Sequence, residues 1–256
     1  MASTARAPID ARALRDAAWL RASLGGVWLL TAITVLHPYY REVGADYLGR
    51  LGLPEWIMYA ADAGELVLGL WVVRFPMTRL LAALHVVAVA GFTAILAWLE
   101  PMLLVSPFGV LSKNLPFAVA AVVAWRLTHE GWTPRTERLL SFGMAAIWIT
   151  EGLFPKILFQ QQVELDMAPA AGLTFLPPWL LVGAVGVLQL ASGIAVLVLR
   201  RRAWLLLLQA LALAVLPVVV GILMPRLWVH PFGPFSKNLP ILAGTLLLYR
   251  RCSRSS

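Results

Sequence analysis

The sequence predicts an all-α integral membrane protein with eight transmembrane helices, built as two four-helix bundles that repeat each other in the same orientation. Three observations support this fold class. Hydrophobic residues make up 60% of the 256 positions and charged residues only 13%, which is too apolar for an ordinary soluble domain. Several apolar runs approach the roughly 20 residues that a spanning helix needs. The two halves of the chain also resemble each other at a constant spacing.

The spans are expected to be helical because a backbone in lipid must satisfy its own hydrogen bonds, and no segment alternates with the period of a β-barrel. The first span should be retained, since it follows a polar stretch and lacks the small-x-small cleavage site of a signal peptide. The expected spans are residues 17–37, 55–74, 79–99, 111–127, 138–154, 178–199, 203–224 and 236–250.

These spans divide the chain into two units joined by the polar stretch "THEGWTPRTE". The predicted organisation is a cytoplasmic N-terminal segment (1–16), a first four-helix unit (17–128), a cytoplasmic linker (129–136), a second four-helix unit (137–251) and a cytoplasmic tail (252–256).

The distribution of basic residues predicts the orientation in the membrane. Most of the 21 Lys and Arg residues fall in the segments that lie on the same side as the N-terminus, and such an excess marks the cytoplasmic side. We therefore expect both termini inside, in a bacterial-type inner (plasma) membrane. The net charge of +8 is interpreted as a topology signal with lipid as the contact, and not as a nucleic-acid surface. Cys252 is the single cysteine, so a disulfide or thiolate metal site is not expected.

An offset of 124 residues superposes the second half on the first, pairing Lys113 with Lys237 and Asn114 with Asn238. The first helices align at a slightly smaller offset, which pairs Trp28 with Trp148. Because each unit would cross four times, both units enter from the same side, as parallel repeats do.

The most similar segments are two turns, "SPFGVLSKNLP" at 106–116 and "HPFGPFSKNLP" at 230–240, called here the first and second corners. The helix after each corner is short for a membrane, so we expect the Pro-Phe-Gly backbone to fold back and lie buried against the bundle. Ser112 or Asn114 could cap the following helix, and Pro116 suits its first turn.

A lysine beside a helix N-terminus favours an anion or a polarised carbonyl. One hypothesis is therefore that the corners hold an anionic or quinone-like ligand near the outer face. The other is that each corner is structural and its lysine pairs with a carboxylate or reaches lipid headgroups. The candidate ligand-binding residues are Lys113, Asn114, Lys237, Asn238 and His230.

Ionisable residues inside spans are costly and are functional candidates. Asp62 and Glu65 share a helix face, and Glu65 and His85 lie at similar depths on consecutive helices, so we expect them to meet. Such a pair could relay protons as the catalytic element. Gln189 and Gln209 occupy the equivalent places and could hydrogen-bond each other, which favours the alternative that both pairs only hold helices together.

Glu151 is expected to pair with Lys156 or Lys237, with contact to a ligand as the alternative. The histidines lack the spacing of a haem or metal site, so no metal is predicted.

The run "VHPFGPFSKNLPILAGTLLL", with "WITEGLFPKILF" and the Glu/Gln-x-x-x-Gly helix, resembles the DoxX-like family of four-helix membrane proteins, here in tandem. The first copy lacks the carboxylate of "WITEG", having "WLLTAITVLHP" instead. The resemblance implies a membrane subunit associated with oxidoreductases, one of which is a thiosulfate:quinone oxidoreductase.

On this basis we expect a subunit that supports an electron-transfer system, with a quinone or sulfur-oxyanion site near the outer face. A nucleotide-binding partner would be a separate subunit, since no GxGxxG follows a strand. The alternatives are a small-molecule or lipid transporter, or a membrane scaffold for a partner enzyme.

Overall fold

The computed structural model describes residues 10–199 and 202–254. Within these ranges the chain is helical and contains no strand. The first nine residues of the expected N-terminal segment, Arg200 and Arg201 of the turn between the sixth and seventh spans, and the last two residues of the tail lie outside the described residues.

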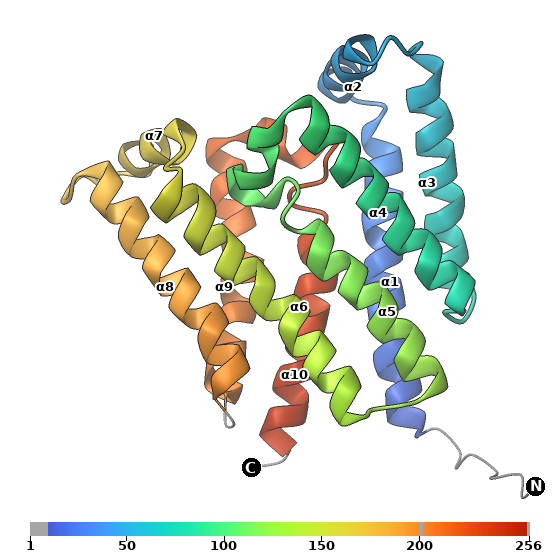
Figure 1. The fold of residues 1–256 in the computed structure, drawn as a ribbon. Coiled ribbons are helices and arrows are strands. Elements are labelled where there is room, and N and C mark those ends of the chain that lie inside the picture. Colours follow the sequence, from blue (N-terminus) through green and yellow to red (C-terminus); the bar gives the residue numbers. More distant parts are fainter. Residues whose placement is uncertain (1–9, 200–201, 255–256) are drawn as a thin grey trace, which may run out of the picture.

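Eight long helices occupy the positions expected for spans (Figure 1). They are α1 (Ala11–Thr34), α3 (Trp56–Arg74), α4 (Arg79–Leu99), α5 (Asn114–His129), α6 (Pro134–Gly152), α8 (Pro178–Val198), α9 (Ala203–Leu223) and α10 (Asn238–Arg254). The start of α1 and the end of α10 lie at the same end of the bundle (Figure 1), as an even number of crossings requires.

Five of the described helices, namely α1, α3, α4, α8 and α9, are long and apolar enough to cross a membrane. The number becomes six if α6, with its π-helical end Leu153–Leu158, is combined with α7 (Gln162–Ala170) across a 92° bend. Helices α5 and α10 contain only 16 and 17 residues. They lie at the centre of the bundle, where protein surrounds them, so their lengths need not match a lipid thickness.

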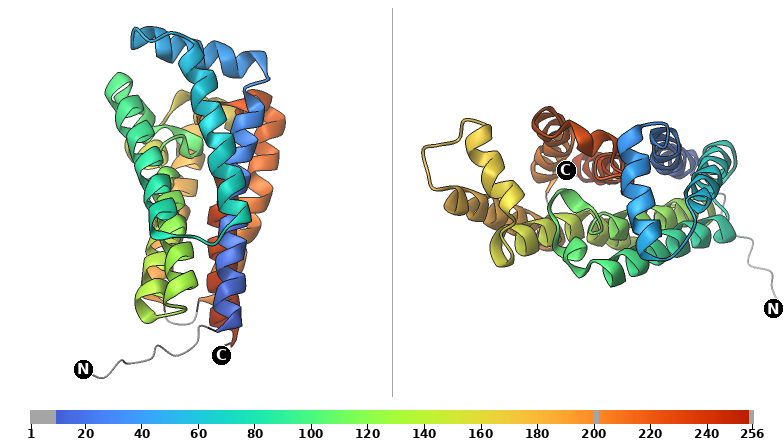
Figure 2. Two further views of the ribbon diagram at one scale, coloured as in Figure 1. Left: turned by 90° about the vertical axis from the view of Figure 1, so that its right-hand side faces the viewer. Right: turned by 90° about the horizontal axis from the view of Figure 1, so that it is seen from above.

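The two units share one core. Helices α1, α5, α6 and α10 pack on one another across the unit boundary, while α3 packs on α1, α4 on α5, α8 on α6 and α9 on α10. Fully buried side chains of both units, such as Leu24, Phe117, Met144 and Ile241, belong to one cluster. The expected two bundles are therefore fused into a single body, with α3 and α4 at one edge and α8 and α9 at the other (Figure 2).

Consecutive helices at the edges barely touch, because α3 and α4 each pack against the centre, and so do α8 and α9. At the end of the bundle opposite the termini, a short helix crosses each unit: α2 (Pro38–Arg50) in the first and α7 in the second (Figures 1 and 2). These helices are called lids below. Thr78 and Thr133 cap α4 and α6 at the other end, which fixes where those helices begin.

Both corners are buried, as expected. The first follows the 3-10 turn Pro101–Val105 and contains the turn Pro107–Gly109, and the second follows the turn Pro225–Val229. Phe108 and Gly109 have φ of 65° and 70°, and Gly233 has 58°, so the chain reverses sharply there. Capping by Ser112 or Asn114 was wrong: α5 has no side-chain cap, because Lys113 occupies the N-cap position and an ammonium group cannot accept a hydrogen bond.

Candidate functional site

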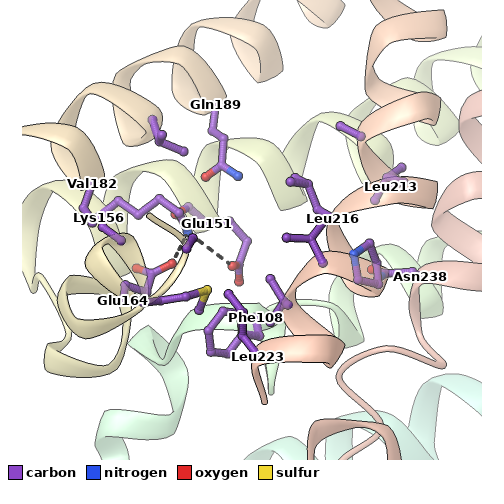
Figure 3. Close-up of a pocket in the computed structure, with 18 of the residues that line it drawn as sticks. Phe108, Glu151, Lys156, Glu164, Val182, Gln189, Leu213, Leu216, Leu223 and Asn238 are labelled. Atoms are coloured by element: carbon purple, nitrogen blue, oxygen red, sulfur yellow. Dashed lines mark hydrogen bonds and ion pairs between the residues drawn. The ribbon is translucent and has the colours of Figure 1, made fainter. Parts of the chain in front are cut away.

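Each unit contains one apolar cavity beneath its lid. The first cavity, about 270 Å³, lies between α1, α3 and α4 and is covered by α2. The second cavity, about 330 Å³, lies between α6, α8 and α9 and is covered by α7 (Figure 3). Both arise because the edge helices stand apart from each other and leave a space that the centre does not fill.

The two cavities are built from equivalent positions. Pairs of residues that lie 124 positions apart line the two cavities. Val89 and Leu213, on the third long helix of each unit, are one such pair. Glu65 in the first cavity corresponds to Gln189 in the second, and Asn114 corresponds to Asn238. The duplication has therefore produced two versions of one site.

The lysine of each corner lies at the cavity of the other unit. Lys113 belongs to the first unit but lines the second cavity, and Lys237 of the second unit lines the first cavity. Lys113 Nζ donates to the Pro234 carbonyl at 2.7 Å, and Lys237 Nζ donates to the Val110 carbonyl at 3.4 Å. A buried ammonium needs such acceptors, and the irregular corner backbone supplies them. Each lysine thus bonds the opposite corner, but among the described residues the two line different cavities and do not share one.

In the first cavity the acidic groups come from α3. Asp62 is buried and its Oδ1 accepts from the Tyr40 hydroxyl of the lid at 2.6 Å. Glu65 lies on the same face and interacts electrostatically with Lys237. This polar end thus holds two carboxylates and one ammonium group.

In the second cavity the acidic groups come from α6 and the lid. Lys156 Nζ lies 2.7 Å from Glu164 Oε1 and 3.9 Å from Glu151 Oε2 (Figure 3). Glu151 Oε1 also accepts from Ser112 Oγ at 2.7 Å, and Glu151 interacts electrostatically with Lys113. Two carboxylates therefore face two ammonium groups. Of the two partners expected for Glu151, Lys156 is the one observed.

His85 and Glu65 do not form a pair: no hydrogen bond or ion pair among the described residues joins them. His85 is fully buried behind the cavity, where its Nδ1 bonds the Leu81 carbonyl at 2.7 Å and its ring stacks on Phe117. The reason is that α3 packs on α1 whereas α4 packs on α5, so a short connection does not make α3 and α4 neighbours.

The expected bond between Gln189 and Gln209 is also absent from the described part of the chain. Gln209 Nε2 donates instead to Ser192 Oγ of α8 at 2.7 Å, which joins α9 to α8. Gln189 points toward the second cavity (Figure 3).

His230 lies in the second corner, outside the lining of both cavities. Its Nδ1 accepts from the Phe232 N–H at 3.3 Å and its ring packs on Tyr39. Burial, with the nearby charge of Lys237, lowers the pKa of His230 to about 4. A neutral ring that accepts a backbone hydrogen bond is suited to holding the corner.

Several buried polar atoms at the cavities have no hydrogen-bond partner among the described residues, and most of them are acceptors. They are Asp62 Oδ2, Glu65 Oε2 and Asn114 Oδ1 in the first cavity, and Glu164 Oε2, Gln189 Oε1 and Asn238 Oδ1 in the second. Each cavity also has one donor without a partner, the indole N–H of Trp28 or Trp148. Buried polar groups normally have partners, so both cavities suit a ligand that donates and accepts hydrogen bonds.

The orientation of Asn114 follows from its neighbours. The Thr93 hydroxyl donates to the Val89 carbonyl at 2.6 Å, so its oxygen must accept from Asn114 Nδ2 at 2.7 Å. The amide oxygen is then the atom left without a partner. Pro217 replaces the threonine in the second unit, and Asn238 has no such bond.

A family model described as the DoxX-like family matches the chain twice, over residues 25–122 and 145–246. The chain belongs to the DoxX-like family. The two matched regions agree with a tandem duplication, and each contains one cavity-forming set of helices. DoxX-like proteins form a membrane family that is often linked to oxidoreductase systems. Comparison with curated proteins and with solved structures finds no match.

Sequence reasoning missed the contribution of the lids in this DoxX-like protein. Tyr40 and Glu164 occupy equivalent lid positions at the offset of 124, and both bond a polar group of the cavity wall. The offset could have indicated them, although the residue types differ. Burial and the hydrogen bond to Glu100 raise the pKa of Tyr47, the second lid tyrosine, to about 12, so this phenol remains a donor that fastens α2 to the end of α4.

Proposed function

We propose that this DoxX-like protein is the membrane subunit of an electron-transfer system, and that its first cavity binds the hydroxyl-bearing form of a lipid-soluble quinone. The observation that carries the proposal is an apolar space of about 270 Å³ whose polar end contains Asp62, Glu65 and Lys237. Ligand sites of this kind are mostly apolar, with a few polar groups that fix orientation.

The ligand would enter from the bilayer. Phe92 and Ile95 of α4 line the first cavity and are also half-exposed on the edge of the molecule. Because α3 and α4 barely touch, the side of the cavity between them faces lipid, while the α2 lid covers the end. Such access favours a membrane-dissolved molecule over a water-soluble one.

The hydrogen-bonding pattern favours a hydroxyl group over a sulfur oxyanion. Three acceptors without partners and one indole donor surround the first cavity, and a hydroxyl group can complement both types. An oxyanion only accepts hydrogen bonds, and it would approach two carboxylates. Lys237, the cation that would attract it, already interacts with Glu65 and a corner carbonyl.

The residues can also take up protons. A bound quinone would supply the two-electron, two-proton chemistry, with electrons passing to a separate oxidoreductase subunit. Glu65 and Asp62 would accept protons from the ligand's hydroxyl groups. Lys237 would stabilise the negative charge of Glu65, and the Tyr40 hydroxyl would hold Asp62 in place.

The proposal can be tested with purified protein and two probes, decylubiquinol and decylubiquinone. We expect a quinone in the lipid extract, and tighter binding of the quinol than of the quinone at neutral pH. Glu65→Gln should weaken quinol binding and remove its pH dependence, whereas Glu42→Gln, a change at an exposed lid position, should have no effect. His85→Gln should also leave binding unchanged, because His85 lies outside the cavity.

If Glu65→Gln binds decylubiquinol and decylubiquinone with the same affinities as the unchanged protein, Glu65 does not have the proposed role. Absence of a quinone and of saturable binding, combined with lipid or solute flux in vesicles without a partner, would favour the transporter alternative.

A further inference from the structure

We propose that the second cavity is a separate binding site for a neutral, hydroxyl-bearing apolar molecule taken from the bilayer, which it holds without exchanging protons. This role goes beyond the redox role proposed for the first cavity. It follows from the charge balance of the second cavity, from its acceptors without partners and from the position of its opening.

The two carboxylates and two ammonium groups of the second cavity balance in charge, and Glu164 Oε2 is the one buried carboxylate oxygen among them without a hydrogen-bond partner in the part of the chain that the structure describes. Glu164 and Glu151 both interact with Lys156, Glu151 accepts from Ser112, and Lys113 donates to a carbonyl of the second corner. A net charge on the ligand would find no free counter-charge. Since burying an unpaired charge is expensive, the site should reject both anions and cations.

The position of Glu65 is neutral in this unit, because Gln189 replaces it. An amide cannot take up a proton from a hydroxyl group, although its oxygen can accept a hydrogen bond. Gln189 Oε1 and Asn238 Oδ1 have no hydrogen-bond partner within residues 10–199 and 202–254. Asn238 is only 8% exposed, so its oxygen cannot rely on bulk solvent.

One donor complements these acceptors. The Trp148 indole N–H also lacks a partner, and Trp148 lines the same cavity. A single hydroxyl group can donate to one of the amide oxygens and accept from the indole. Alcohols and phenols meet this requirement, whereas ethers and esters, which only accept, leave the amide oxygens unpaired.

The opening indicates where the molecule comes from. Val185 of α8 and Leu216 and Val219 of α9 line the cavity and are 40%, 47% and 44% exposed. They lie at the edge of the bundle, where α8 and α9 make few contacts. The α7 lid covers the end of the cavity, fastened by the ion pair between Glu164 and Lys156 (Figure 3). An apolar molecule can thus enter sideways from lipid, with its hydroxyl group directed to the polar end.

The test uses 4-pentylphenol, its methyl ether 4-pentylanisole, and two cavity-filling variants at equivalent positions, Val89→Phe and Leu213→Phe. Equilibrium dialysis against empty micelles should give two saturable 4-pentylphenol sites in the unchanged protein. Each variant should retain one site and the double variant none.

In Val89→Phe protein, where only the second cavity is open, 4-pentylanisole should bind at least about tenfold more weakly than 4-pentylphenol, because an acceptor buried without a partner is costly. Asn238→Leu in this background should weaken 4-pentylphenol to a similar degree.

Two results would overturn the proposal: loss of all saturable binding in Val89→Phe, or equal affinity for the phenol and its ether in the second cavity. If Val89→Phe does not fold, Ile95→Trp, at a half-exposed position of the first cavity, closes that cavity from its lipid side. Quinol binding by Leu213→Phe reports on the first cavity separately, so the two proposals can fail independently.

Discussion

Replacing Lys156 by methionine should detach the second lid from the bundle. Lys156 is buried, and its ammonium group lies 2.7 Å from Glu164 of α7 and 3.9 Å from Glu151 of α6. Methionine has a similar length but no charge, so Lys156→Met leaves two carboxylates close together in an apolar space. The side chains of Lys156 and Glu164 are only 10% and 8% exposed, so water cannot replace the lost partner.

Removal of one partner from a buried ion pair typically costs about 3–5 kcal/mol of unfolding free energy. For a chain of this size each kcal/mol corresponds to roughly 2–4 °C in melting temperature, so we expect a decrease of about 10 °C in detergent-solubilised protein. The double variant Lys156→Met/Glu164→Met removes charge from both partners. It should recover most of the loss, because an apolar pair of similar volume often substitutes well.

The assay is thermal unfolding, followed by tryptophan fluorescence, of Lys156→Met, Glu164→Met, the double variant and the unchanged protein. Glu130→Gln, which removes the charge of a partly exposed partner of Arg126, is the control and should change stability by about 1 kcal/mol or less. If Lys156→Met melts with the unchanged protein, or if the double variant is as unstable as the sum of the single variants, the ion pair does not hold the lid and the reasoning is refuted.

Three further predictions follow from the packing, the topology and the corner histidine. Gly152→Ala should lower the free energy of unfolding by about 1–3 kcal/mol, because a Cβ there would lie 2.5 Å from a carbonyl oxygen of α8. Gly64→Ala, where a Cβ would meet nothing within 4 Å, should raise it by about 0.5–1 kcal/mol; thermal unfolding measures both. An impermeant thiol reagent should label Asp166→Cys, in a Cys252→Ser background, only from outside the cell, and native Cys252 only from inside; labelling of both from one side would contradict the topology. Burial lowers the pKa of His230 from an ordinary 6.5 to about 4 in the folded protein, so its stabilising contribution is complete above pH 6.5 and is lost as the pH falls toward 4. The variant His230→Asn keeps an acceptor but does not titrate, so its melting temperature should fall less steeply than that of the unchanged protein over this pH range. An equally steep fall would refute the role of His230.

The sequence predicted helix positions well, because hydrophobicity and breaking residues are local signals. Proline at Pro178 and threonine caps at Thr78 and Thr133 mark helix starts within a few residues of those expected. The same signals do not say which helices contact lipid. Helices α5 and α10 were expected to span like the others, but they form the buried centre, and their 16 and 17 residues are completed by the folded corners.

Side-chain partners were harder to predict, because depth along a helix does not fix its neighbours. Glu65 and His85 lie at comparable depths, yet α3 and α4 turn to different central helices and the two side chains separate. Lys237, which is 172 residues away in the sequence, lines the cavity together with Glu65 and interacts with it electrostatically. Within one repeat no pattern indicates this arrangement, since it exists only because the two units face each other.

The crossed corners explain which parts of the site are alike in the two units and which differ. A lysine at the boundary must satisfy the carbonyls of the opposite corner as well as the opposite cavity, so Lys113 and Lys237 are constrained from both sides. A carboxylate needs only to lie within reach of that ammonium group. It can therefore stand on α3 in one unit, as Glu65, and on α6 in the other, as Glu151. The same corner thus supports a first cavity with more carboxylates than ammonium groups and a second cavity in which the two are equal in number, so the duplicated architecture encloses two cavities of different charge.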